Sequence, residues 1–508
     1  MKTRSGSKLQ RGVSSSLSLL AVAVMAGSMA PVALAADYQW GEVTARTTAS
    51  VSVGSTFRTE SMHDDLAGQV GNQNFDTGQP VSTVLKGVAD IELKYRNYGL
   101  FLRGNAWYDY ELKKGNRSVG NLPNGFTPGE PLSDSGFPSE QKFSGVQLLD
   151  AYVYGEWDLG NMPISARAGR QALAWGESLF LSGGVNIINP YDVAATRRAG
   201  SELKEALLPV GMVSSSFAVT DNLNLQAFYQ YEWEATRLDQ CGTFFSAFDG
   251  IQEGCLGMDL GFGIVPGTFE EPEDGGQYGV AVHYYSMPLN TEFGAYYINY
   301  HSRTPFVDFA VDFSNYAVIF PEDIEVYGLS AATTLMGKTV YGEVAYRPDQ
   351  PVTGGLTGPY ENFENWNFIL GTVFSIPQFM GADELSISGE AGYTHTSDMP
   401  ENGLFGNTTR EAYGYRLLLS MPFTDVFMGV NITPSLGVNH DLEGTSANGD
   451  FVDDRLTATL GAKFEYLQRY TLDMNYTVNT GGKDEGPGGI KNLMHDRDFF
   501  GVSLKVDF

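Results

Sequence analysis

Apolar and polar residues alternate one by one along many stretches of this sequence. In residues 100–112 most bulky apolar positions fall on one face of an extended chain, and the charged positions fall on the other. Residues 85–96 and 470–478 repeat the pattern. Because successive side chains point to opposite faces of a β-strand, a period of two predicts strands with one apolar and one polar face. The chain is therefore predicted to be all-β.

The connections between these predicted strands alternate in length. Residues 172–209 and 234–276 form long links, whereas 97–99, 160–162 and 220–222 are tight turns. A soluble β-sandwich would also alternate in polarity, but its packing does not require this asymmetry of links. Long loops on one side and short turns on the other are typical of outer-membrane barrels. We predict a single transmembrane antiparallel up-and-down β-barrel of about 18 strands, or about 16 if one pair is misplaced, with long extracellular loops and short periplasmic turns.

The last residues of the sequence have the pattern of a strand that closes such a barrel. Phe500, Val502, Leu504, Val506 and Phe508 occupy alternate positions. Because an open sheet edge cannot exist in hydrocarbon, the last strand must be paired and must face lipid along its length. An amphipathic strand that ends in Phe is also the signal read by the machinery that inserts outer-membrane barrels. Phe508 is therefore the predicted membrane-insertion signal.

The N-terminal residues have the composition of a secretory signal peptide. A basic start without acids precedes an apolar stretch, and the residues Ala33, Leu34 and Ala35 offer a small-x-small cleavage site before Ala36. A short membrane anchor is the alternative, but the apolar run is shorter than the roughly 20 residues of a spanning helix. We predict a signal peptide over 1–35 and a barrel over 36–508, exported to the outer membrane of a Gram-negative cell.

Composition and motifs exclude several classes of function. The chain has 32 Lys+Arg against 60 Asp+Glu, a formal net charge of −28, so it is not expected to bind the phosphate backbone of a nucleic acid. Its two cysteines and six histidines do not come at the spacing of a metal site, so we predict no metal and no cofactor. Common catalytic motifs are absent from the sequence, so an enzyme is not expected. A barrel hydrolase that assembles its triad from distant strands is the alternative.

Several motifs resemble those of a known family. They are LKYRNYG (93–99), LDAYVYG (149–155), GRQ (169–171) with WGE (175–177), INPYD (188–192) and CGTFF (241–245). Their order and spacing are similar to the "domain of unknown function 1302" family of proteobacterial outer-membrane proteins. The resemblance implies an outer-membrane location and a link with a periplasmic or lipoprotein partner and an inner-membrane transporter, in settings of hydrophobic-compound metabolism. It carries no functional residue onto this sequence.

The long link 172–209 is predicted to fold into the barrel and narrow its lumen. It combines an apolar stretch around Phe180 with a short helix over 201–208, which Pro209 ends. Such a segment is poorly suited to lie free in water. The alternative is a cap over the mouth of the barrel. The candidate constriction residues carry charges of this link and are Arg197, Arg198, Glu202 and Lys204.

The polar faces of the strands carry charges of both signs. A barrel of about 18 strands encloses a lumen wide enough for water, so these faces are expected to line it. One interpretation is that opposite charges pair across the wall and keep the lumen hydrated. The other is a ladder that selects the solute, with the candidates Arg96, Arg103, Asp109, Glu156 and Arg167.

The link 234–276 is unusually apolar for a loop. Phe244, Phe245 and Phe248 are candidates for a site at which a lipophilic molecule lands, and the alternative is a lid packed over the barrel mouth. Cys241 and Cys255 lie in the same link, and export allows them to form a disulfide. Loop-entropy estimates give such a bridge about 3 kcal/mol of stabilisation.

Together these features predict an outer-membrane transport channel. The apolar loop, the narrowed lumen and the family resemblance favour uptake or passage of small hydrophobic or amphipathic molecules. A general diffusion porin is the main alternative, and a hydrolase or a structural or adhesive surface barrel is less favoured. The predicted partners are outer-membrane lipid, lipopolysaccharide, the barrel insertion machinery, a small lipophilic solute, a periplasmic or lipoprotein partner and an inner-membrane transporter.

Overall fold

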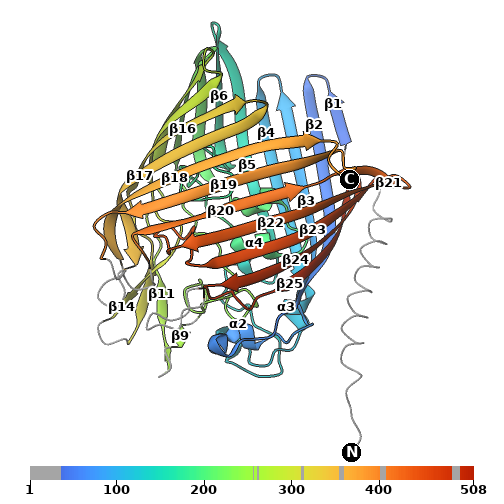
Figure 1. Cartoon of the computed structure of the whole chain (residues 1–508), viewed down its shortest axis with the longest axis vertical. Helices are drawn as coiled ribbons and strands as arrows, with labels where there is room; N and C mark the ends of the chain where they lie inside the picture. The colour runs from blue at the N-terminus through green and yellow to red at the C-terminus, as the bar shows by residue number, and fades with distance from the viewer. Residues whose placement is uncertain are drawn as a thin grey trace, which may run out of the picture.

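The computed structural model describes residues 36–255, 257–259, 263–310, 314–353, 360–400, 408–482 and 492–508. Eighteen antiparallel strands form a closed barrel, which confirms the predicted fold class and strand number (Figure 1). The predicted signal peptide over 1–35 lies outside the described residues. Within the described ranges, no helix is long and apolar enough to cross a membrane.

Each barrel strand pairs with the next one along the chain. In order, the strands are β2 (Val43–Arg58), β3 (Pro80–Tyr95), β4 (Tyr98–Asp109), β5 (Ser144–Leu159), β6 (Met162–Gln171), β7 (Val210–Thr220), β8 (Leu223–Gln230), β12 (Gln277–Ser286), β13 (Thr291–Tyr300), β16 (Ile324–Leu335), β17 (Lys338–Thr353), β18 (Tyr360–Pro377), β19 (Glu384–Thr396), β20 (Glu411–Ser420), β22 (Val430–Glu443), β23 (Arg455–Tyr466), β24 (Tyr470–Gly481) and β25 (Phe499–Asp507). Two short strands, β1 (Ala36–Trp40) and β21 (Phe423–Phe427), pair with β2 and β22.

The first and last barrel strands close the ring. β25 pairs with β2 over nine residue pairs, which end at Ser50 opposite Asp507. Beyond them the backbone N–H of Phe508 donates to the carbonyl of Ala49 at 2.8 Å, so the terminal aromatic residue belongs to the seam. β1 continues the same edge, because it pairs with the first five residues of β2. The edge of β2 therefore carries a partner strand along most of its length.

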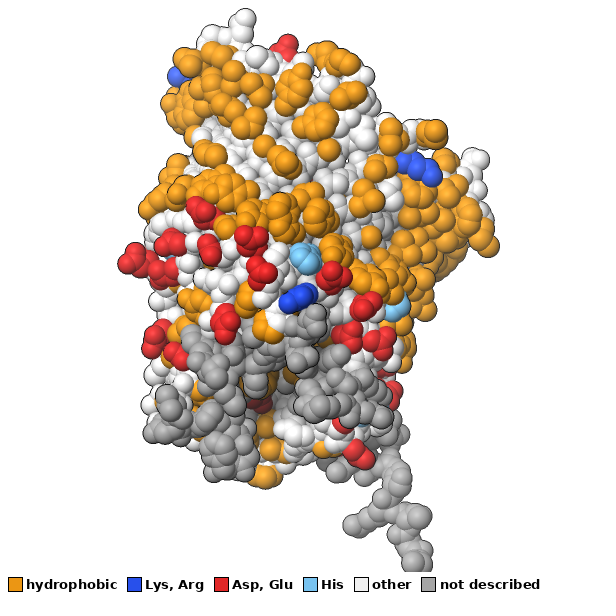
Figure 2. Space-filling model, turned by 60° about the vertical axis from the view of Figure 1, so that its left-hand side comes forward, with side chains coloured by type: hydrophobic (Ala, Val, Ile, Leu, Met, Phe, Trp, Pro, Cys, Tyr) orange, Lys and Arg blue, Asp and Glu red, His pale blue; other side chains and the backbone are white. Residues whose placement is uncertain are grey.

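Large apolar side chains cover the outside of the barrel wall (Figure 2). They occupy alternate strand positions, and Val153 on β5 and Leu329 on β16 are 55% and 65% exposed. Inward positions carry buried polar residues instead, such as Glu343 on β17 and Asn367 on β18. A wall that is apolar outside and polar inside suits a surrounding of lipid. In Figure 2, acidic side chains gather below this apolar surface, toward the long loops.

The two ends of the barrel differ, which confirms the predicted alternation of long loops and short turns. At one end the strands are joined by tight turns, such as the one between β3 and β4. The other end, at the bottom of Figure 1, carries the short elements of the long loops. These elements are η1 (Asp64–Leu66), α2 (Val70–Gln73), α3 (Tyr110–Lys114), η2 (Leu122–Asn124), η3 (Ser139–Gln141), β9 (Met258–Asp259), β10 (Ile264–Val265), β11 (Gly267–Phe269), β14 (Phe306–Phe309) and β15 (Tyr316–Ile319).

The helix predicted over 201–208 is shorter in the structure. Two helices, α4 (Val193–Arg197) and α5 (Leu203–Ala206), lie in the link between β6 and β7. Asp192 begins α4, because its side chain accepts the N–H of Ala195 at 2.7 Å. Each helix is about one turn long, so contacts with the barrel rather than helix propensity must hold them.

Removing the last strand should prevent the barrel from forming. A chain truncated after Asp498 loses β25 and leaves nine residues of β2 without a partner in lipid. We expect loss of the heat-modifiable folded band on gels and degradation of the chain in cells. A chain that lacks only 37–40 loses most of β1 but keeps the seam, and this matched control should fold. Heat-modifiable barrels from the truncated chain would contradict closure through β2 and β25.

Candidate functional site

Residues 172–209, which join β6 to β7, form an inner segment that contacts inward-facing side chains of distant strands. The Glu343 carboxylate on β17 accepts the backbone N–H of Glu177 at 2.8 Å and that of Val185 at 2.7 Å. A Cβ atom at Gly184 would lie 1.8 Å from a Glu343 carboxylate oxygen. Glycine at this position therefore permits the close approach of the inner segment to β17.

Glu390 on β19 holds the neighbouring part of the inner segment. Its carboxylate accepts the backbone N–H groups of Leu179, Phe180 and Leu181 at 2.8, 3.1 and 2.8 Å. It also accepts the hydroxyl of Ser178 at 3.0 Å. Hydrogen bonds to an ionised acceptor are roughly twice as strong as neutral ones. Glu390 thus fixes a stretch of backbone that no sheet or helix pairs.

Two further charged residues bind the same stretch. Arg347 on β17 donates to the carbonyls of Gly183 and Gly184, each at 2.7 Å. Asp450, in the link between β22 and β23, accepts the N–H of Ser182 at 2.9 Å and that of Gly183 at 2.7 Å. Gly183 and Gly184 are buried, so these bonds satisfy backbone groups that would otherwise lack partners. The first half of the inner segment is therefore anchored by charged side chains of the barrel.

The second half of the inner segment contacts the opposite wall. Lys86 on β3 forms an ion pair with Glu205 and donates to the Gly200 carbonyl at 2.9 Å. Lys505 on β25 pairs with Glu202 at 3.5 Å. β17 is the ninth strand after β3 in the ring of eighteen, so these two strands face each other across the barrel. The inner segment therefore has contacts on both sides of the interior.

An apolar cluster packs the inner segment against a third part of the wall. Trp175 lies edge to face on Phe228 of β8, with ring centroids 5.1 Å apart, and its indole N–H donates to Gln226 at 2.8 Å. Val185 and Ile188 are buried in the same cluster, which also includes residues of β7, β12, β13 and β16. Each such buried side chain contributes about 1.5–3 kcal/mol. This side of the barrel interior is packed rather than open.

Buried charges border this cluster. Arg303, which follows β13, donates to the Ile188 carbonyl at 3.1 Å and to the Gln230 side chain at 2.7 Å. Burial lowers the pKa of Arg303 to about 9, so the guanidinium stays protonated at neutral pH. Burial also raises the pKa of Asp192, although Arg198 and Arg237 act against this shift. These buried charged groups are tolerated because each of them is hydrogen-bonded.

The interior stays open between the inner segment and the wall formed by β23, β24 and β25. A cavity of about 420 Å³ lies there, lined by residues 196–202 and by many threonine, serine and asparagine side chains of the strands. Its charged lining residues are Arg197, Arg198, Lys463, Lys505, Glu202 and Asp473. This lining carries two more positive than negative formal charges, although the whole chain carries −28.

A second cavity, of about 60 Å³, shares Arg197 and Arg198 with the first. Much of its remaining lining comes from the long loops and includes Phe244 and Phe245. Arg197 forms an ion pair with Asp239 and lies 5.4 Å from the centre of the Phe245 ring. The two arginines therefore stand between an aromatic cavity on the loop side and a polar cavity inside the barrel.

The four constriction candidates lie close together within the inner segment. Arg197, Arg198 and Glu202 line the larger cavity, and Lys204 forms an ion pair with Glu202 at 3.0 Å. Their role in limiting passage stays a prediction.

Three of the five ladder candidates lie on the inward faces of three neighbouring strands, β4, β5 and β6. Arg103 on β4 pairs with Asp90 at 2.9 Å and with Asp150 at 3.1 Å. Arg167 on β6 lies 5.6 Å from the ring of Tyr152. Glu156 shares the β5 face of Tyr152, opposite the exposed Val153. Selection of a solute by these residues stays a prediction.

The other two ladder candidates lie where their strands end, and Asp109 lines the smaller cavity. Arg96 lies in the tight turn after β3, where it pairs with Glu42 and its side chain is 61% exposed. Asp109 ends β4 and caps α3, because its carboxylate accepts the N–H of Leu112 at 3.1 Å. In the sequence, both residues continue the apolar–polar alternation of their strands. In the structure, β3 ends at Tyr95 and β4 ends at Asp109.

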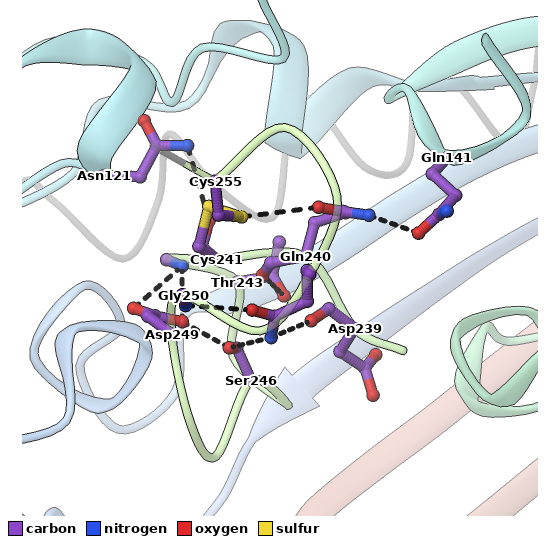
Figure 3. Close-up of a disulfide and its surroundings, with 12 residues drawn as sticks. Asn121, Gln141, Asp239, Gln240, Cys241, Thr243, Ser246, Asp249, Gly250 and Cys255 are labelled. Atoms are coloured by element: carbon purple, nitrogen blue, oxygen red, sulfur yellow. Dashed lines mark hydrogen bonds between the residues drawn. A yellow bond between two sulfur atoms is a disulfide. The ribbon is translucent and has the colours of Figure 1, made fainter. Parts of the chain in front are cut away.

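Cys241 and Cys255 form the predicted disulfide (Figure 3). The Asn121 side chain donates to the Cys241 carbonyl at 3.3 Å, and the Gln240 side chain donates to Gln141. Asn121 and Gln141 belong to the loop after β4, whereas the disulfide belongs to the loop after β8. The bridge therefore lies where two long loops pack together.

The three phenylalanines of the landing-site hypothesis have different surroundings. Phe244 is 1% exposed and packs against Phe75 and two guanidinium groups. Its ring is buried among the folded loops, which favours the lid interpretation for this part of the link. Phe244 and Phe245 both line the smaller cavity and Phe248 is 45% exposed, so a role in receiving cargo stays a prediction for all three residues.

Glu390→Ala should loosen the inner segment without unfolding the barrel. The substitution leaves three backbone N–H groups and the Tyr341 hydroxyl without their acceptor, and each of these groups that is buried costs about 1–3 kcal/mol. We expect trypsin to cut faster after Arg197, Arg198 and Lys204 in the detergent-solubilised variant, as measured by mass spectrometry of the peptides. Glu384→Ala, at the turn end of the same strand, is the matched control. Equal cleavage rates in both variants would show that Glu390 is not an anchor.

Comparisons with solved structures return low similarity along almost the whole chain. OccAB1 of Acinetobacter baumannii is 10% identical, with a TM-score of 0.46, and the match covers 91% of this chain and 96% of that chain. The outer membrane channel DcaP of Acinetobacter baumannii is 9% identical, with a TM-score of 0.41 and coverage of 94% and 100%. A BenF-like porin from Pseudomonas fluorescens Pf-5 is 9% identical, with a TM-score of 0.45 and coverage of 91% and 98%.

A search of curated proteins found no significant match. The sequence does match a family model over residues 16–508, nearly its whole length, and this agrees with the resemblance of its motifs. The chain therefore belongs to the family described as "Protein of unknown function (DUF1302)".

Proposed function

We propose that the protein is an outer-membrane channel for small amphipathic molecules. The observation that carries this proposal is the polar cavity of about 420 Å³ between the inner segment and the wall of β23, β24 and β25. The apolar outer face and the closed ring of strands support a location in lipid. No catalytic step is part of the proposal, which concerns passage alone.

Selection in such a channel needs an obstruction. Barrels of about 16–18 strands leave an aqueous channel that the wall side chains alone do not fill. The anchored inner segment would narrow that channel to the side of β23, β24 and β25. A solute would then pass Arg197 and Arg198, because these residues line both cavities.

The lining of the two cavities favours an amphipathic solute with an anionic group. Phe245 offers an aromatic surface on the loop side, and the larger cavity carries an excess of basic side chains. A charge about 4 Å away contributes about 1 kcal/mol even in bulk water, and more in a narrow cavity. A solute with an apolar body and a carboxylate would use both surfaces in turn.

Export and assembly complete the proposal. Cleavage after Ala35 would leave Ala36, the first residue of β1, as the mature N-terminus. The insertion machinery would recognise β25 and Phe508, and lipid and lipopolysaccharide would contact the apolar face. A periplasmic or lipoprotein partner and an inner-membrane transporter would receive or deliver the solute at the end with the short turns.

Replacing Arg197 and Arg198 by Gln should change the ion selectivity of the channel. We expect the permeability ratio of anion to cation, measured from the reversal potential in planar bilayers, to fall by about fivefold, as loss of about 1 kcal/mol implies. Arg96→Gln removes an exposed arginine of a tight turn and is the matched control, which should leave the ratio unchanged. An unchanged ratio in the double variant would contradict passage along the arginine pair.

Solute uptake distinguishes this proposal from a general diffusion porin. Proteoliposomes containing the native protein should take up an aromatic carboxylate faster than a neutral sugar of similar mass. Equal rates, limited by molecular size alone, would favour the diffusion porin.

A further inference from the structure

Two segments from opposite ends of the sequence pack together on the long-loop side of the barrel seam. They are residues 59–79, between β2 and β3, and residues 492–498, before β25. The backbone N–H of His63 donates to the Asp496 carboxylate at 2.9 Å, and the Arg497 guanidinium donates to Gln69 at 2.5 Å. The same Asp496 oxygen accepts the Asn72 side chain at 2.7 Å. The two segments therefore form one ordered surface, because β2 and β25 are neighbours.

This surface brings together three groups that bind metal ions in many proteins. His63, Asp65 and His495 each offer one ligand atom, and all three atoms lie within 4.8 Å of one another. The Nε2 atom of His495 is already 3.0 Å from the Asp65 carboxylate. The imidazole rings of His63 and His495 have centroids 5.1 Å apart. Two imidazoles and a carboxylate are a ligand set that suits Zn²⁺.

The side chain of His495 is buried beside the other two groups. Its side chain is 0% exposed, and its Nδ1 atom has no hydrogen-bond partner among the residues that the structure describes. A neutral imidazole carries one donor and one acceptor, and a buried polar atom without a partner is costly. The protein thus buries a histidine beside a second histidine and a carboxylate, and one of its two ring nitrogens has no partner.

We propose that His63, Asp65 and His495 bind a divalent transition-metal ion of the Zn²⁺ class. Zinc bonds of about 2.0–2.1 Å in tetrahedral geometry place ligand atoms about 3.4 Å apart, which modest side-chain rotation would achieve from the present distances. Glu60 can supply a fourth ligand, because its carboxylate lies 3.2 Å from the Nε2 atom of His63. The remaining coordination position would otherwise hold water.

The bound ion would link the loop after β2 to the segment before β25, across the seam at which the barrel closes. His495 and Asp65 are 430 residues apart in sequence, so the ion would cross-link the two ends of the barrel chain. The proposal does not depend on the transported solute, and failure of the channel proposal would leave it intact.

Zinc titration of the tag-free mature protein in detergent tests the site. Calorimetry should show one Zn²⁺ bound per chain and no binding of Mg²⁺, and Zn²⁺ should raise the thermal unfolding temperature. Asp65→Asn and His63→Ala should each weaken Zn²⁺ binding by more than about tenfold, because even loss of a group that only orients a ligand costs about 10- to 100-fold. The control variant His395→Ala lacks a histidine that faces a single carboxylate, Glu411. This variant should bind Zn²⁺ as the native protein does.

Two results would overturn the proposal. One is a native protein that binds no Zn²⁺ at micromolar concentration. The other is Zn²⁺ binding that both Asp65→Asn and His63→Ala leave unchanged. Heat-modifiability on gels shows whether each variant is folded, and the exposed position of Asp65 makes Asp65→Asn the variant best suited to keep the barrel intact.

Discussion

Closure of the backbone hydrogen bonds between β2 and β25 is the constraint on which the rest of the structure depends. A strand in hydrocarbon has no water to satisfy its N–H and C=O groups, so the sheet must return to its own first strand. Nine residue pairs and the bond from Phe508 to Ala49 accomplish this return. Closing the ring at eighteen strands also fixes its width, and a lumen of that width is not filled by side chains of the wall.

The inner segment fills part of this wide lumen. Irregular backbone at membrane depth is tolerated only where protein surrounds it or where it lines a water-filled cavity. The first condition is met because Glu343, Glu390 and Arg347 bind its backbone on one wall and Lys86 binds it on the other. The second is met because residues 196–202 line the larger cavity. The residues that anchor the segment are therefore distinct from Arg197 and Arg198, which face the remaining space. Substitution of the two arginines would therefore leave intact the contacts that hold the inner segment in place.

The sequence predicts the barrel well because its signals are local. The alternation and the pattern up to Phe508 can each be read within a few residues, and the length of a link depends only on where two consecutive strands end and begin. The sequence fails where the signal is spatial: Glu343 and Glu390 resemble any polar lumen residue, and His63 and His495 meet only because the ring closes. It also fails at strand ends, where Asp109 continues the alternation but caps a helix. Phe244 shows the same limit, since apolar composition does not distinguish a buried lid from an exposed surface.

The most direct test of the account is the single-channel conductance of a variant whose residues 179–207 are replaced by a short Gly-Ser linker. The variant keeps every barrel strand, so it should insert into planar bilayers as the native protein does. The account predicts a conductance several-fold above that of the native channel, because the linker no longer occupies the space between opposite walls. A folded variant with native conductance would contradict the claim that the inner segment limits passage.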